Sequence, residues 1–100
     1  MSAEFLQRFA ERRRSSAERL QALKGQLEGA DAGALQAVLC EAMQVAHVIA
    51  GTAGMFGDAP LGLLAGEVEQ ALEAARSCED AAAAVEPIRR LSAALQAEAA

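Results

Sequence analysis

The chain has 100 residues, a length typical of one domain, so we expect a single domain over residues 1–100. Hydrophobic residues make up 53% of the chain, but only three residues are aromatic, so aliphatic side chains and Ala must build the core. The net charge of −5 argues against nucleic acid as the main partner. Residues 1–30 hold six basic and four acidic residues, whereas residues 31–100 hold three basic and ten acidic residues.

The composition also predicts a fold class and a location. Ala, Leu, Glu, Gln and Arg are strong helix formers, and no segment alternates apolar and polar residues as a strand does, so we expect an all-α protein. The N-terminus has no apolar stretch of the signal-peptide kind, and no run of about 20 apolar residues stays free of charge. These features indicate a cytoplasmic protein without a membrane partner.

Four helical segments are predicted, at about residues 3–28, 32–56, 59–76 and 81–98. In the first segment Ser15 and Glu18 have capping-box spacing, so it is either one long helix or a short extra N-terminal helix followed by a second. In the last segment Pro87 indicates either a kink or a helix that starts near Glu86. Short connections between long helices predict an antiparallel up-down four-helix bundle.

The breaks between the segments carry helix-stop and helix-start residues. Gly29 suits the position after a helix, and Asp31 suits the cap of the next one. Gly57 and Asp58 repeat this pattern, and Asp80 is a candidate cap for the last segment.

The single histidine, His47, lies in the second segment. On a helical wheel the apolar residues of that segment form one stripe, and His47 falls roughly 120° away from its centre. The predicted core stripe consists of Leu35, Val38, Leu39, Ala42, Val45, Ala46, Ile49, Ala53 and Phe56. Gly51 and Gly54 follow His47 on the outer flank, although a glycine inside a helix costs about 1 kcal/mol relative to Ala. Close approach of another backbone, or of a bulky anion beside the histidine, would explain both glycines.

The stretch from His47 to Gly57, HVIAGTAGMFG, resembles the signature of the histidine-containing phosphotransfer (HPt) family, H-x-[LI]-K-G-[SAT]-[AS]-x-x-[FLV]-G. The flanking helices also resemble that family, so the resemblance covers nearly the whole chain. It implies a four-helix bundle that accepts a phosphoryl group on His47 from a receiver aspartyl phosphate or a kinase and passes it to another receiver. It also implies that a response-regulator receiver or a hybrid histidine kinase is the partner. That receiver would hold the Mg²⁺ and supply the other catalytic groups, so this chain would be a carrier and not an enzyme, with His47 as its nucleophile and no cofactor of its own.

One position departs from the signature. The family usually has Lys three residues after the histidine, beside the phosphoryl oxygens, where this chain has Ala50. Gln44, one turn before His47, is a candidate hydrogen-bond donor in its place. Because of Ala50, a second hypothesis remains open, in which a degenerate HPt-like bundle binds a receiver or kinase without phosphotransfer. A third is a purely structural helical bundle.

Other conspicuous residues favour ordinary roles. Cys40 lies on the flank of His47, but two ligands do not make a metal site, and Cys40 and Cys78 are expected to be free thiols. Glu67, Glu69 and Glu73 are interpreted as a solvated helix side. The basic run 12–14 is either solvated or touches an acidic partner. We expect a monomer, although an apolar face left on the first segment could support a dimer.

Overall fold

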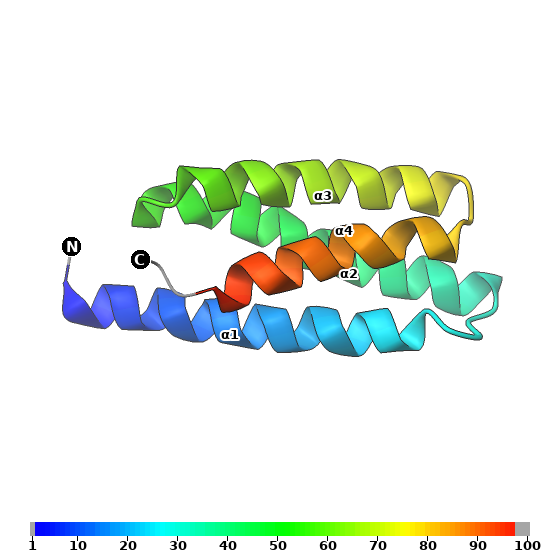
Figure 1. The fold of residues 1–100 in the computed structure, drawn as a ribbon, viewed down its shortest axis with the longest axis horizontal. Helices are drawn as coiled ribbons and strands as arrows, with labels where there is room; N and C mark the ends of the chain where they lie inside the picture. Colours follow the sequence, from blue (N-terminus) through cyan, green and yellow to red (C-terminus); the bar gives the residue numbers. More distant parts are fainter. Residues whose placement is uncertain (1, 98–100) are drawn as a thin grey trace.

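The computed structural model describes residues 2–97 and is built from four α-helices and one 3-10 turn. The elements are α1 (Ala3–Gln26), α2 (Ala32–Thr52), η1 (Ala53–Phe56), α3 (Ala59–Ser77) and α4 (Ala81–Gln96). The helices run alternately up and down along one long axis, and no strand occurs in residues 2–97 (Figure 1). The predicted all-α class and the up-down arrangement of four helices are therefore confirmed.

The helix ends follow the predicted breaks. Asp31, Asp58 and Asp80 each accept a hydrogen bond from the backbone N–H three residues later, which satisfies a donor that the first helical turn leaves free. Gly29 and Gly57 have φ values of +71° and +81°, in the left-handed region where glycine is favoured. Local chemistry thus defines the turns that reverse the chain.

The first segment is one continuous helix. No short extra N-terminal helix forms, and the capping box at Ser15 is not used. No Gly or Pro interrupts residues 3–24, so nothing in that stretch opposes helical backbone angles. Phe9 and Leu20 are eleven residues apart, about three turns, so an unbroken helix places both on the same buried face.

Helix α4 also runs unbroken through its proline. It begins at Ala81 and contains Pro87, so the alternative start near Glu86 is wrong. Asp80 caps the helix, and the run of Ala after it has the strongest helix propensity of any residue type. Ala84 and Ile88 are fully buried on either side of the proline, so packing holds this stretch in place.

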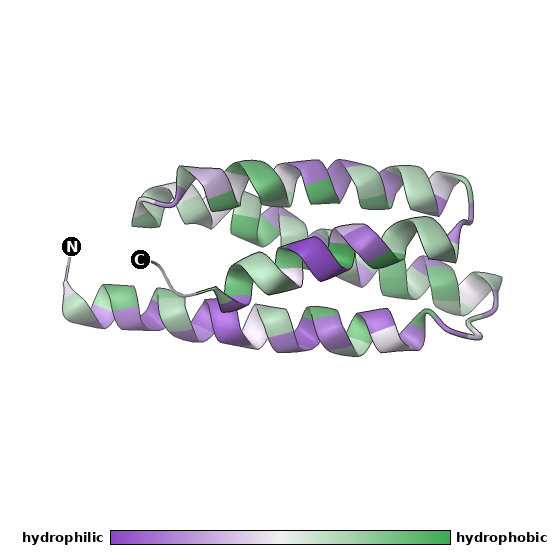
Figure 2. Ribbon diagram, viewed as in Figure 1, coloured by the Kyte–Doolittle hydropathy of each residue, from purple (hydrophilic) through white to green (hydrophobic). Residues whose placement is uncertain are grey.

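The core lies along the inward faces of all four helices. Helix α2 packs most extensively against α3, and α1 packs against α4. The apolar stripe predicted for residues 32–56, which lies on α2 and η1, is buried, except that Val45 and Phe56 are only partly buried. Figure 2 shows that hydrophilic residues concentrate along α1 and in the middle of α4. The α2–α3 pair is the more apolar half of the bundle.

One stretch in the described part of the chain, Ala32–Phe56, is long and apolar enough to cross a membrane by length and composition. The core helix of a globular bundle passes the same test. Here Leu39, Ala42, Ala46 and Ile49 of that helix are fully buried within the bundle.

Candidate functional site

His47 stands on the outer flank of α2. Its side chain is 68% exposed, whereas its neighbours Ala46 and Ile49 are fully buried on the core side of the same helix. The exposure predicted from the helical wheel is thus confirmed. A rigid helix therefore presents the imidazole to solvent, where an incoming molecule can reach it.

The imidazole is held by a carboxylate of the next helix. Nδ1 of His47 lies 3.1 Å from Oε2 and 3.3 Å from Oε1 of Glu69 on α3. Because a carboxylate only accepts hydrogen bonds, this contact favours the tautomer in which Nδ1 carries the proton and donates it. Nε2 then keeps a free lone pair. Since the ring is largely exposed, that nitrogen is the one available for chemistry.

The interpretation of Glu69 as a merely solvated residue is wrong. The Glu69 side chain is only 32% exposed, and it bonds to His47. A signal for this contact was present in the chain, because His47 precedes Asp58 by eleven residues and Glu69 follows it by eleven. In an antiparallel helical hairpin, residues equally far from the turn lie at equal height. Cys40 and Arg76 are also equally far from Asp58 along the chain, and they too lie beside one another.

The other predicted site residues surround His47 without bonding to it. Gln44 is exposed, but no hydrogen bond joins it to His47 in the described structure, and Glu69 bonds the ring in its place. Ala50 is half-buried one turn after His47. Gly51 and Gly54 are exposed, and a Cβ built on either would meet nothing within 4 Å.

Close approach of a second backbone is therefore not the reason for Gly51 and Gly54 within this chain. The close approach occurs at Gly62 of α3, where an added Cβ would lie 3.5 Å from the carbonyl oxygen of Ala50 and 3.6 Å from Cβ of Ala53. Helix α3 thus lies within van der Waals reach of α2 at Gly62, near the turn. The open space beside Gly51 and Gly54 is left on the outer surface.

Few cations surround the imidazole. Helix α2 contains no Lys or Arg, and the one basic residue of α3 is Arg76, two turns beyond Glu69. Arg76 is bound to Glu73 at 2.7 Å, and this hydrogen bond raises the pKa of Arg76. The charges closest to His47 in sequence and across the helix pair are therefore acidic.

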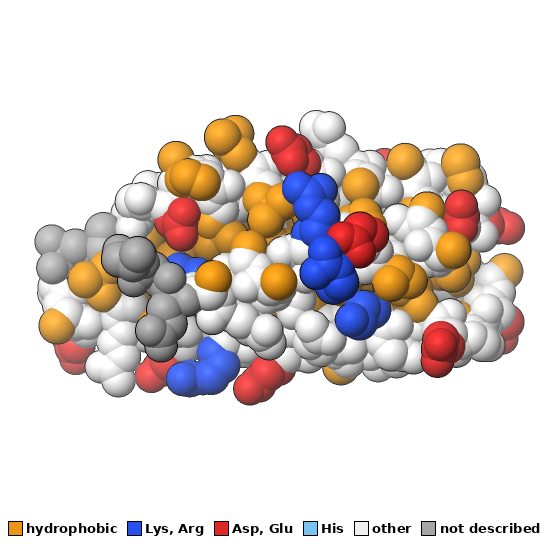
Figure 3. All heavy atoms as spheres, viewed as in Figure 1, with side chains coloured by type: hydrophobic (Ala, Val, Ile, Leu, Met, Phe, Trp, Pro, Cys, Tyr) orange, Lys and Arg blue, Asp and Glu red, His pale blue; other side chains and the backbone are white. Residues whose placement is uncertain are grey.

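Basic residues gather elsewhere on the molecule. Figure 3 shows a band of Lys and Arg side chains crossing one face, and no His side chain is visible on that face. Arg89, Arg90 and Lys24 lower the pKa of Glu86, with the hydrogen bond from Arg89 contributing most, so these side chains form one cluster on α1 and α4. This cluster does not belong to the His47 site.

The residues of the described chain offer no metal centre. No group of three or more His, Cys, Asp and Glu side chains comes together in residues 2–97, and Cys40 and Cys78 are exposed free thiols. The site is an exposed imidazole with one nitrogen fixed by a carboxylate and the other free. Such a group can act as a nucleophile or accept a proton. Comparison with protein-family models, curated proteins and solved structures gave no match.

Proposed function

We propose that this protein is a phosphoryl carrier of a cytoplasmic two-component phosphorelay. In this proposal His47 accepts a phosphoryl group from a receiver aspartyl phosphate or a kinase and passes it to another receiver. The observation that carries the proposal is the His47–Glu69 contact, because it leaves an unprotonated nitrogen exposed on a rigid helix. The resemblance of residues 47–57 to the HPt signature supports the same function.

The chemical step follows from this geometry. The lone pair of Nε2 attacks the phosphorus of the aspartyl phosphate, a P–N bond forms, and the P–O bond to the aspartate breaks. The aspartate leaves as a carboxylate, and no proton has to move because Nδ1 already carries one. The ring becomes positively charged, and the carboxylate of Glu69 beside Nδ1 stabilises that charge.

In the reverse direction the same contact keeps the phosphorylated ring oriented. When a second receiver attacks the phosphorus, the P–N bond breaks and Nε2 regains its lone pair. The Mg²⁺ and the remaining catalytic groups belong to the partner receiver in this proposal, so the chain acts as a carrier without a cofactor of its own. The open surface at Gly51 and Gly54 gives the partner's active site room to approach His47.

A second candidate is an HPt-like bundle that binds a receiver or kinase without transferring the phosphoryl group. One observation favours it: Ala50 stands where the family has Lys, and the carboxylate beside the ring is not balanced by a Lys or Arg on α2. Phosphoryl oxygens would then approach an acidic surface, which disfavours their charge. A carrier with this surface depends on a cation from its partner.

One experiment separates the two candidates. The purified protein is incubated with a receiver domain labelled on its aspartyl phosphate, and acid-labile, alkali-stable label is followed on the protein. Transfer that is lost in His47→Gln supports the carrier. If the protein binds the receiver in a sedimentation or titration experiment but gains no label, the second candidate is correct. Label that persists in His47→Gln would refute the assignment of His47.

A further inference from the structure

At one end of the bundle, the described residues supply three helices and not four. Helix α1 begins at Ala3, but the antiparallel α4 ends at Gln96, well before it reaches that end (Figure 1). The side chain of Arg13 donates hydrogen bonds to the carbonyl oxygens of the last residues of α4 and of Ala97. Within residues 2–97, the ten residues of α1 before Arg13 therefore have no part of α4 beside them. They amount to roughly 15 Å of helix.

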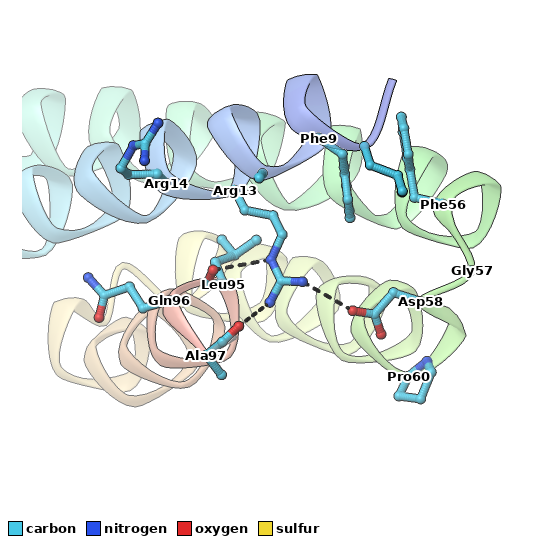
Figure 4. A pocket seen from close by; sticks show the side chains of 12 residues that line it. Phe9, Arg13, Arg14, Phe56, Gly57, Asp58, Pro60, Leu95, Gln96 and Ala97 are labelled. Carbon is cyan, nitrogen blue, oxygen red and sulfur yellow. Dashed lines mark hydrogen bonds and ion pairs between the residues drawn. The ribbon is translucent and has the colours of Figure 1, made fainter. Parts of the chain in front are cut away.

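A groove of about 840 Å³ occupies this end. Its apolar lining comes from α1, η1, α3 and the end of α4, through Leu6, Phe9, Phe56, Pro60 and Leu95. Figure 4 shows the Phe9 and Phe56 rings side by side, and the Arg13 guanidinium reaching from α1 toward Asp58. The pair from Arg13 to Asp58 thus bounds the groove on the side where α4 ends.

The aromatic residues of the chain all gather at this end. The rings of Phe9 and Phe56 stack with centroids 4.2 Å apart and an angle of 3° between their planes, and Phe5 stacks on Phe56 at 4.7 Å. Phe5 is nevertheless 40% exposed and Leu6 48% exposed. Exposed large apolar side chains around a groove mark a surface that binds another molecule.

The charge of this end selects among possible occupants. Arg14 also lines the groove and, within the described residues, has no ion-pair partner, whereas Arg13 is bound to Asp58 and to α4. Residues 1–14 hold four basic and two acidic residues. A second copy joined through this same end would bring two basic segments together, which is unfavourable. An apolar occupant with acidic residues on its edge is complementary both to the apolar lining of the groove and to the positive charge of residues 1–14.

We propose that this groove binds an amphipathic α-helix of a partner protein, with an apolar face against Leu6, Phe9 and Phe56 and an acidic edge toward Arg14. The bound helix occupies the place that further turns of α4 would fill. A partner helix of about ten residues is long enough to span this stretch of α1. The proposal goes beyond the phosphoryl carrier function, because neither His47 nor Glu69 lines the groove.

The test uses the whole protein and two synthetic peptides of about three helical turns. Both carry Leu at helical spacing in an Ala background and a fluorescent label, with Glu in the flanking positions of one and Lys in those of its twin. Fluorescence anisotropy should show saturable binding that is about fivefold tighter for the Glu peptide at low salt, a preference that added salt reduces.

Two variants test the location of the binding site, and a third variant is the matched control. Leu6→Asp should weaken binding of the Glu peptide by about tenfold or more, because an apolar contact is lost and a negative charge is introduced. Arg14→Glu should reverse the preference between the two peptides. Leu63→Asp changes an apolar side chain that is 72% exposed on α3, outside the groove, and should leave binding unchanged.

Three results would overturn the proposal. The first is no saturable binding of the Glu peptide, or equal binding of the two peptides at low salt. The second is a loss of affinity in Leu63→Asp as large as that in Leu6→Asp. The third is a dimer of the peptide-free protein in sedimentation equilibrium that Leu6→Asp dissociates, since the occupant would then be a second copy of this chain.

Discussion

The Nδ1 atom of His47 on α2 lies 3.1 Å from Oε2 of Glu69 on α3, and the turn at Asp58 joins these two helices. The contact orients the ring and leaves its other nitrogen toward solvent. The two residues belong to different helices, and α2 and α3 form the most extensive helix–helix contact of the described structure. The relationship therefore depends on the geometry of the α2–α3 pair and not on a flexible loop.

Replacing Glu69 tests the role of this carboxylate in the proposed transfer. Glu69→Gln preserves the size of the side chain and its ability to accept a hydrogen bond but removes the charge that stabilises the phosphorylated ring. We expect the rate of label transfer from a phosphorylated receiver to fall by about tenfold or more, as for other residues that orient a reactive imidazole. Glu67→Gln, which changes an exposed carboxylate on the same helix, is the control and should leave the rate unchanged. Equal rates in all three proteins would contradict the role of Glu69.

Restoring a cation tests whether Ala50 limits transfer. Ala50 is half-buried one turn after His47, and a Lys there can extend its ammonium group along the surface toward the phosphoryl oxygens. Ala50→Lys should raise the transfer rate by roughly fivefold at low salt, with a smaller gain at high salt. Ala37→Lys adds the same charge at an exposed position of α2 more than two turns before His47. If both variants gain equally, the effect comes from overall charge and not from the site.

The open surface at Gly51 predicts opposite effects on stability and transfer. Because a Cβ at Gly51 meets no other atom within 4 Å, Gly51→Ala should raise the free energy of unfolding by about 0.5–1 kcal/mol. Gly51→Leu should keep a stable fold but slow transfer, because its side chain fills the space beside His47. Gly25→Leu, also at an open helical position, is the control for helix propensity. Chemical denaturation and the transfer assay measure the two effects, and unimpaired transfer in Gly51→Leu would show that the space is not needed.

Adjacent arginines of α1 should differ sharply in their contribution to stability. Arg13 is 12% exposed and donates hydrogen bonds at 3.2 and 3.0 Å to the carbonyl oxygens of Leu95 and Ala94. Such bonds satisfy carbonyls at a helix end, where a positive charge is favourable. Arg13→Ala should lower the free energy of unfolding by about 1.5–3 kcal/mol, whereas Arg14→Ala should change it by less than about 0.5 kcal/mol. Equal losses in urea denaturation would contradict the role of Arg13.

Gly62 of α3 faces α2 across the helix pair, with room for little more than a methyl group. An added Cβ would make ordinary contacts with Ala50 and Ala53, so Gly62→Ala should fold, but the longer side chain of Gly62→Leu has to force the helices apart. We expect Gly62→Leu to lower the free energy of unfolding by about 1–3 kcal/mol. Gly66→Leu, one turn later at a position with nothing within 4 Å, should not lower it. A destabilisation common to both would indicate a general effect of Leu on α3.

Local sequence features predicted most of the secondary structure and the exposure of the histidine. Asp31, Asp58 and Asp80 cap the helices at the expected places, since a capping side chain bonds to a backbone group only three residues away. His47 is exposed because helical periodicity alone separates it from the apolar stripe of its own helix. Two local ambiguities, at Ser15 and at Pro87, were both resolved toward a continuous helix, and buried residues lie on both sides of each: Phe9 and Leu20 in α1, and Ala84 and Ile88 in α4.

The tertiary structure alone decided which residues from different helices meet. Glu69 reaches His47 because α3 runs antiparallel to α2 in a register that the turn at Asp58 determines, and Gln44 does not bond to the ring. The groove beside Phe9 exists because the antiparallel α4 ends at Gln96, before it reaches the N-terminal end of α1. This relation between the lengths of two helices cannot be inferred from either helix alone. Periodicity and caps act within a few residues, whereas these contacts depend on how whole helices pack. The equal spacing of His47 and Glu69 from Asp58 becomes informative only once α2 and α3 are known to pair around that turn.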